Sequence, residues 1–180
     1  MQKKYLRLLF LALIFPGPAE SGNIKNRAEE LIQAQFGKEI NIQFNKFKLN
    51  PDLKTAIAVE SKQKFLNDFL YVWKISIGDS LAGYALLDNV LGKSMPITFI
   101  VFFDLEGIIL GTRVVKYREA IGGEISSSRW NRQFFGKDYT SGFKIGADID
   151  GISGATISVK SMTRGIQRLT FLLKYIKDDL

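Results

Sequence analysis

The chain has 180 residues, enough for one domain with a substantial core, and its apolar share of 46% and charged share of 24% are those of a folded globular protein. The absence of cysteine and histidine excludes thiolate catalysis, Ser-His-Asp and Cys-His arrangements, zinc sites built on Cys or His, haem ligation by His, and iron–sulfur clusters. The formal net charge is +7, but the basic residues are scattered among acids and no recognition motif is present, so no nucleic-acid partner is expected.

Residues 1–21 have the pattern of a secretory signal peptide. Three basic residues among the first seven precede the apolar run 8–15, and a Pro-Gly-Pro tripeptide interrupts that run. The run is shorter than the ~20 apolar residues of an ordinary transmembrane helix. We therefore expect an extracytoplasmic protein, in the periplasm or at the cell surface, with cleavage after Ala19 or Ser21. An uncleaved membrane anchor is the alternative.

Residues 22–68 predict a helix–strand–helix portion. Apolar residues recur at helical spacing over 24–36, whereas 40–49 alternates between apolar and polar side chains, as in a strand. Pro51 suits the first turn of a second helix, which we expect to continue to about Phe65.

The middle of the chain is rich in predicted strands. The segments 70–77 and 81–90 indicate a hairpin joined by Gly-Asp-Ser, and 97–103 and 108–117 indicate a second pair joined by a turn that contains Gly107. Short connections between successive strands favour a mainly antiparallel sheet.

Three further segments complete the predicted fold. We expect a helix over 124–135, a polar loop over 137–148 and a long amphipathic helix over 157–176. The fold class is therefore α+β, a single domain with a mainly antiparallel twisted sheet and flanking helices. The apolar stripe that should dock the last helix on the sheet consists of Met162, Ile166, Leu169, Leu173 and Ile176.

Residues 150–156, Asp-Gly-Ile-Ser-Gly-Ala-Thr, stand directly before that last helix. Backbone N–H groups at a helix N-terminus lack partners within the helix, and the helix dipole favours negative charge there. The small residues Gly154 and Ala155 leave Thr156 accessible, so local physics predicts an anion site with an accessible hydroxyl. The local alternatives are that Thr156 or Ser153 caps the helix and that Asp150 forms an Asx turn.

The same seven residues resemble the flavinylation motif Asp-x-x-Ser/Thr-Gly-Ala-Thr of the FMN-binding domain family. This family includes the flavin-carrying subunits of the Rnf and sodium-pumping quinone reductase complexes. The resemblance runs from about Phe69 to the C-terminus and implies an FMN-binding domain at 69–180. Four earlier segments follow the family's order: 83–85 (Gly-Tyr-Ala), 96–99 (Pro-Ile-Thr-Phe), 119–124 (Glu-Ala-Ile-Gly-Gly-Glu) and 130–134 (Trp-Asn-Arg-Gln-Phe).

The resemblance implies a covalent cofactor. In the family the last Thr of the motif carries FMN through a phosphoester bond, and by position that residue is Thr156. A separate flavin transferase, which uses FAD and a divalent metal, reads the motif and is therefore an expected partner. The implied cofactor-binding residues are Asp150, Ser153, Gly154, Ala155 and Thr156, with Glu119, Gly122, Gly123 and Trp130 lining the flavin pocket.

Several of these residues have a plain structural alternative. The loop 119–124 could simply connect a strand to a helix, and Trp130 and Phe134, one turn apart, could pack in the core rather than flank a flavin ring. Lys160 and Arg164 share a helix face with Thr156, where they either neutralise a phosphate or form a solvated face.

The resemblance predicts an exported flavoprotein that carries electrons through FMN on Thr156, to or from a membrane or extracytoplasmic redox partner. No acid–base constellation and no second cofactor motif is present, so a carrier or flavin subunit is favoured over an enzyme. The first alternative is a flavin-dependent reductase that acts on a small extracytoplasmic substrate. The second is a basic interaction module without flavin.

Overall fold

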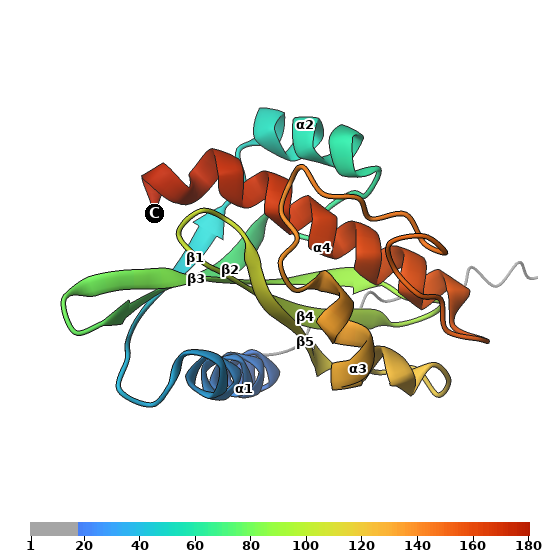
Figure 1. The fold of residues 1–180 in the computed structure, drawn as a ribbon, viewed down its shortest axis with the longest axis horizontal. Coiled ribbons are helices and arrows are strands. Elements are labelled where there is room, and N and C mark those ends of the chain that lie inside the picture. Colours follow the sequence, from blue (N-terminus) through green and yellow to red (C-terminus); the bar gives the residue numbers. More distant parts are fainter. Residues whose placement is uncertain (1–17) are drawn as a thin grey trace, which may run out of the picture.

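The computed structural model describes residues 18–180, with side chains from residue 23 onward. One antiparallel sheet has the order β1-β2-β3-β4-β5, with α1 on one face and α4 and α2 on the other (Figure 1). The predicted α+β single-domain fold is confirmed. The elements are α1 (Pro18–Phe36), β1 (Asn41–Lys48), α2 (Pro51–Ser61), β2 (Phe69–Ile77), β3 (Ser80–Leu91), β4 (Pro96–Phe103), β5 (Ile109–Lys116), η1 (Gly123–Ser126), α3 (Ser128–Asn131), η2 (Arg132–Phe134), α4 (Thr156–Ile176) and η3 (Lys177–Asp179).

Two turns of the strand meander depend on glycine. Ile77 pairs with Ser80, so only two residues join β2 to β3, and the first of them, Gly78, has a φ of +57°. Gly107, between β4 and β5, has a φ of +91°. L-residues with a side chain rarely adopt such angles, and these glycines therefore fix both predicted turns.

Both faces of the sheet are buried. On one face, α4 and α2 pack against residues that include Leu70, Val72, Leu86, Val90 and Phe99. On the other, Ile24, Ala28 and Ile32 of α1 pack against residues that include Trp73, Ile75, Ala85, Leu87 and Phe102. The two-residue period of a strand sends successive side chains to opposite faces, so β2 serves both layers.

The N-terminal portion belongs to the same sheet. All eight residues of β1 pair with β2, and β1 is an edge strand. Helix α1 begins at Pro18, six residues before its predicted start at Ile24. Residues 1–17 of the expected signal peptide lie outside the described residues. Within residues 18–180, no helix is long and apolar enough to cross a membrane.

Two predicted helices differ from the observed ones. Helix α2 ends at Ser61 rather than near Phe65, because Lys62 adopts a left-handed φ of 54° and its N–H bonds back to the end of the helix. The helix predicted over 124–135 is instead three short pieces. Its carbonyls at Ile125 and Ser127 accept bonds of 2.7 and 2.9 Å from the buried Asn131 side-chain amide, and the extended backbone of Ser127 separates η1 from α3.

Helix α4 is held by its apolar stripe and by a buried ion pair. All five residues of the predicted stripe are at most 1% exposed. Arg168 Nη2 lies 2.6 Å from Asp88 Oδ2 of β3, and the two side chains are 0% and 1% exposed. The Arg168 guanidinium also donates to the Lys64 carbonyl and lies 4.2 Å from the Phe65 ring centroid. This one side chain therefore ties α4 to the sheet and to the segment after α2.

Replacing Asp88 by Ala should strongly destabilise the protein, because Arg168 would remain buried without its carboxylate. Breaking such a pair costs about 3–5 kcal/mol of unfolding free energy, which urea denaturation would measure. The double variant Asp88→Leu/Arg168→Met, which removes both charges, should recover most of that loss. A loss below ~1 kcal/mol for Asp88→Ala, equal to that of the exposed Asp79→Ala, would contradict a structural role for the pair.

Candidate functional site

Thr156 is the first residue of α4 and its side chain is exposed. The N-cap position belongs to Ala155, and no side chain caps the helix. The alternative in which Thr156 or Ser153 caps the helix is therefore wrong. Within residues 18–180 the Thr156 hydroxyl has no hydrogen-bond partner. The structure thus displays a hydroxyl that helix formation does not use.

The start of α4 can accept an anion. The first hydrogen bond of the helix runs from Val159 N to Ala155 O, so the N–H groups of residues 156–158 have no partner within the helix. The first turn contains no acidic residue that would repel an anion. The positive end of the helix dipole lies at the same end of the helix as these free N–H groups. Lys160 is exposed one turn further on, whereas Arg164 donates to the Lys62 carbonyl at 3.4 Å. Lys160 is therefore the better placed of the two cations.

Gly154 shapes the approach to Thr156 through its backbone. Its φ of +75° is one that residues with a side chain rarely adopt. A Cβ there would find only Ile121 Cγ2, at 3.9 Å. Glycine is required here for the turn, which the Ala155 N–H closes by donating to Ile152 O at 3.1 Å.

The loop that follows β5 packs directly on the acceptor segment. Gly122 has a φ of +85°, and a Cβ on it would lie 2.7 Å from Ala155 Cβ and 2.8 Å from the Tyr117 hydroxyl. Tyr117 in turn donates to the Ile121 carbonyl. A Cβ on Gly123, by contrast, would meet nothing within 4 Å. The structure therefore brings Gly122 against the motif and leaves Gly123 open to solvent.

Glu119 uses its carboxylate within the protein. Glu119 Oε1 accepts the N–H groups of Ser94 at 2.8 Å and Met95 at 3.2 Å. Burial alone would raise the pKa of Glu119, but these bonds, with those from the Lys93 N–H and the Ser158 hydroxyl, outweigh it and hold the pKa below its ordinary value. The carboxylate is ionised at neutral pH and already surrounded by donors.

Trp130 supports the acceptor segment from inside the protein. It is 5% exposed, and its ring lies 5.1 Å from that of Phe134, edge to face. Its indole N–H donates to the Asp150 carbonyl at 2.9 Å, and Gln133 Oε1 accepts the Asp150 N–H at 2.6 Å. The geometry corresponds to the core-packing alternative. The Asp150 carboxylate itself is exposed and makes no hydrogen bond within residues 18–180.

Sequence reasoning missed Gln133 and Asn131 as supports of the site. Asn131 is 1% exposed and accepts the Thr112 hydroxyl at 2.8 Å, which fixes the segment that presents Trp130 and Gln133. The available signal was the run of polar residues between two aromatic ones at 130–134, which is unusual for an ordinary amphipathic helix.

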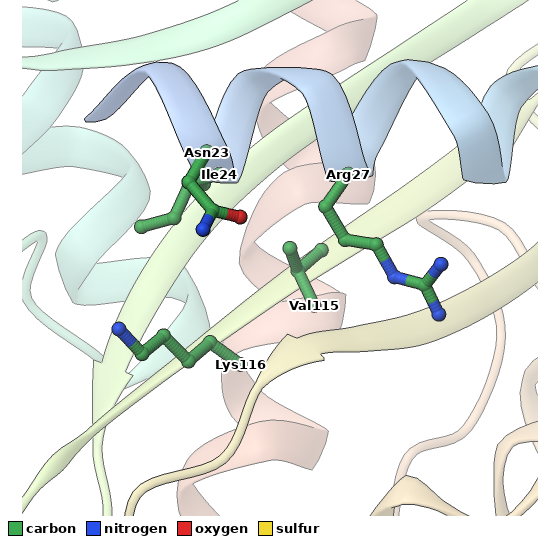
Figure 2. A pocket seen from close by; sticks show the side chains of 5 residues that line it. All are labelled: Asn23, Ile24, Arg27, Val115 and Lys116. Atoms are coloured by element: carbon green, nitrogen blue, oxygen red, sulfur yellow. The ribbon is translucent and has the colours of Figure 1, made fainter. Parts of the chain in front are cut away.

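Two hollows of the described region lie away from Thr156. One, of about 100 Å³, lies between α1 and β5 and is lined by Asn23, Ile24, Arg27, Val115 and Lys116 (Figure 2). The second, of about 170 Å³, lies between the β4–β5 turn and the end of α4. Thr156 itself is exposed, as are the nearby Ile121 and Ile157, so a group attached to its hydroxyl would begin at the surface.

Comparison with known proteins shows which family this part of the chain resembles. Residues 92–170 match the model of the FMN-binding domain, and this stretch contains the loop 119–124, the segment 130–134 and the whole motif 150–156. The acceptor segment thus lies inside the matched domain.

The chain is also similar to the G subunits of ion-translocating oxidoreductase complexes. The proteins of Photorhabdus laumondii and Erwinia tasmaniensis are each 31% identical over 100 residues, which is 49% of this chain and 48% of each relative. The protein of Stutzerimonas stutzeri is 28% identical over 130 residues, 66% of this chain and 56% of the relative. The matched part spans about half the length of these relatives.

Gly122→Ala should destabilise the protein and displace the acceptor segment, because the new Cβ would overlap Ala155 and require a strained φ. We expect a loss of about 1–3 kcal/mol in unfolding free energy, measured by urea denaturation. Gly123→Ala is the matched control and should change stability by less than ~0.5 kcal/mol. Equal losses in the two variants would contradict the contact between the loop and the motif.

Proposed function

We propose that the protein carries FMN on Thr156 through a phosphoester bond and transfers electrons to or from a membrane redox system, since residues 92–170 match the FMN-binding domain. The observation that carries this proposal is the exposed, unbonded Thr156 hydroxyl at the uncapped start of α4. It stands at the last position of a seven-residue motif that lies inside the matched domain.

Attachment requires a partner that activates the hydroxyl, since no base lies at hydrogen-bond distance from it within residues 18–180. The partner we propose is an FAD-dependent flavin transferase. Thr156 Oγ forms the new bond to the phosphorus of the FMN half of FAD, and the pyrophosphate bond of FAD breaks. AMP leaves, and the transferase takes up the hydroxyl proton.

The start of α4 suits the resulting phosphodiester. The three N–H groups of residues 156–158 and the helix dipole face a group that carries one negative charge, an arrangement worth ~0.3–1 kcal/mol at an exposed position. The electrostatic contribution is therefore modest. It orients the group, while the covalent bond retains it.

The chain's own role would be to display the cofactor for electron exchange. Bound FMN supplies one- or two-electron chemistry, and the protein determines its access and potential. A surface position beside α4 would let a partner approach the flavin without opening the core. The relatives are subunits of ion-translocating oxidoreductase complexes, which supports a membrane-associated redox partner. The extracytoplasmic location that we propose is based on the signal-peptide pattern of residues 1–21.

Thr156→Ala should abolish flavin attachment, because the acceptor oxygen is removed. The chain would be coexpressed with a flavin transferase, denatured and inspected for flavin fluorescence on a gel, with intact mass as a second measurement. Thr140→Ala removes another exposed threonine hydroxyl and should leave the fluorescent band unchanged. A fluorescent band that persists in Thr156→Ala would move the attachment to another residue.

Asp150→Asn should slow flavin attachment while leaving stability unchanged. The Asp150 carboxylate has no partner in the described chain, and Trp130 and Gln133 hold only its backbone, so we propose that the transferase uses the charge to position Thr156. The rate of flavin incorporation and the urea midpoint would be measured together. Asp79→Asn in the β2–β3 turn is the control, and an equal rate in both variants would exclude this role.

A further inference from the structure

We propose that Glu119 is a positioning residue, which fastens the loop after β5 to the β3–β4 turn, so that this loop, packed on Ala155, holds Thr156 for flavin attachment. The inference rests on the proposed function and assigns Glu119 a role other than contact with the flavin. We call this connection, made by the Glu119 carboxylate and the N–H groups of Ser94 and Met95, the Glu119 latch.

The latch joins two segments that are distant in sequence. Glu119 follows the end of β5 by three residues, whereas Ser94 and Met95, whose N–H groups it accepts at 2.8 and 3.2 Å, lie between β3 and β4. Three residues after Glu119 the same loop meets the acceptor segment, where a Cβ on Gly122 would lie 2.7 Å from Ala155 Cβ. The carboxylate therefore fixes the loop against which the residue before Thr156 packs.

A glycine makes room for the carboxylate. A Cβ on Gly92 would lie 2.4 Å from Glu119 Oε1 and 3.1 Å from the Met95 carbonyl. The Gly92 N–H donates to that same carbonyl at 3.0 Å and closes the β3–β4 turn. Any side chain at position 92 would therefore push the Glu119 carboxylate away from its donors, which gives a way to open the latch without changing Glu119.

The latch acts on Thr156 through the Gly122 contact. The latch fixes the loop after β5 at Glu119, and Gly122 of that loop meets Ala155, the residue before Thr156. Because a displacement of ~1 Å can slow a reaction by a factor of roughly 100, fixing this loop has a direct effect on the attachment rate.

The kinetic test compares variants in flavin attachment by a purified transferase. Glu119→Ala and Gly92→Ala should each lower the kcat of attachment by a factor of roughly 10 to 100 with little change in KM, because the exposed motif still docks but its hydroxyl is misplaced. Glu106→Ala removes an exposed glutamate from the β4–β5 turn and should behave as wild type.

A second measurement needs no flavin. In NMR spectra of the unmodified protein, the amide protons of Ser94 and Met95 should shift as the Glu119 carboxyl titrates, with a midpoint below its ordinary pKa of 4.5. The carboxylate's contribution to stability is present above that ordinary pKa and is lost as pH falls through the lowered one. Glu119→Gln should abolish the titration of both amides, and Glu106→Gln should not.

The outcomes separate this inference from the proposed function. Wild-type attachment rates in Glu119→Ala and Gly92→Ala, or Ser94 and Met95 amides that do not titrate, would overturn the latch even if Thr156 carries flavin. Absence of flavin from the wild-type chain would overturn the proposed function, while the amide titration would still decide whether the carboxylate joins the loop after β5 to the β3–β4 turn. If Glu119→Ala does not fold, Gly92→Ala and the titration still provide the test.

Discussion

The docking of α4 on the sheet determines where the site lies. Thr156 is the first residue of this helix, and its position follows from how the helix behind it is fixed. The apolar stripe contributes most of the free energy that docks the helix on the sheet, since burial of apolar surface is the largest favourable contribution to folding. The Arg168–Asp88 pair sets the orientation of the helix on the sheet. Complete burial raises the pKa of Asp88, and the adjacent positive charge of Arg168 opposes that rise. An ion pair so deeply buried is costly to break and holds the helix in one register against β3.

A rigidly held helix with an exposed end suits covalent modification. The apolar face of α4 is buried against β3 and β4, while the acceptor residue and most of the segment before it remain on the surface. Trp130 and Gln133 hold the backbone of Asp150 at one end of the acceptor segment, and the loop after β5 holds the other end. Between these supports the side chains of Asp150 and Ser153 are exposed. The enzyme that we propose to modify Thr156 would thus meet a segment whose backbone is fixed and whose side chains are accessible.

The strands, their turns and the last helix could be predicted from local patterns. Alternating or continuous apolar residues bounded by glycine or proline identify β2 to β5, and the stripe on α4 recurs at helical spacing. The segment 124–135 was predicted as one helix because its local pattern contains no strong helix breaker. What divides it is the Asn131 side chain, which reaches back to two carbonyls and across to Thr112 of β5. The hydrogen bond between Asn131 and Thr112 joins segments that are distant in sequence. Helix propensity is a local property and does not report such contacts.

By itself the sequence determined the fold class and an anion site with an accessible hydroxyl, because both depend on short-range patterns. That Thr156 is the residue expected to carry the cofactor is what the resemblance of its motif implies. The roles of Glu119, Gly122, Trp130 and Gln133 were decided only by the tertiary structure. Each role depends on a partner that is distant in the chain: the N–H groups of Ser94 and Met95 for Glu119, Ala155 for Gly122, and the Asp150 backbone for Trp130 and Gln133. Side chains that are far apart in sequence meet only when the sheet brings its connecting loops together, and no local periodicity specifies which of them will be neighbours.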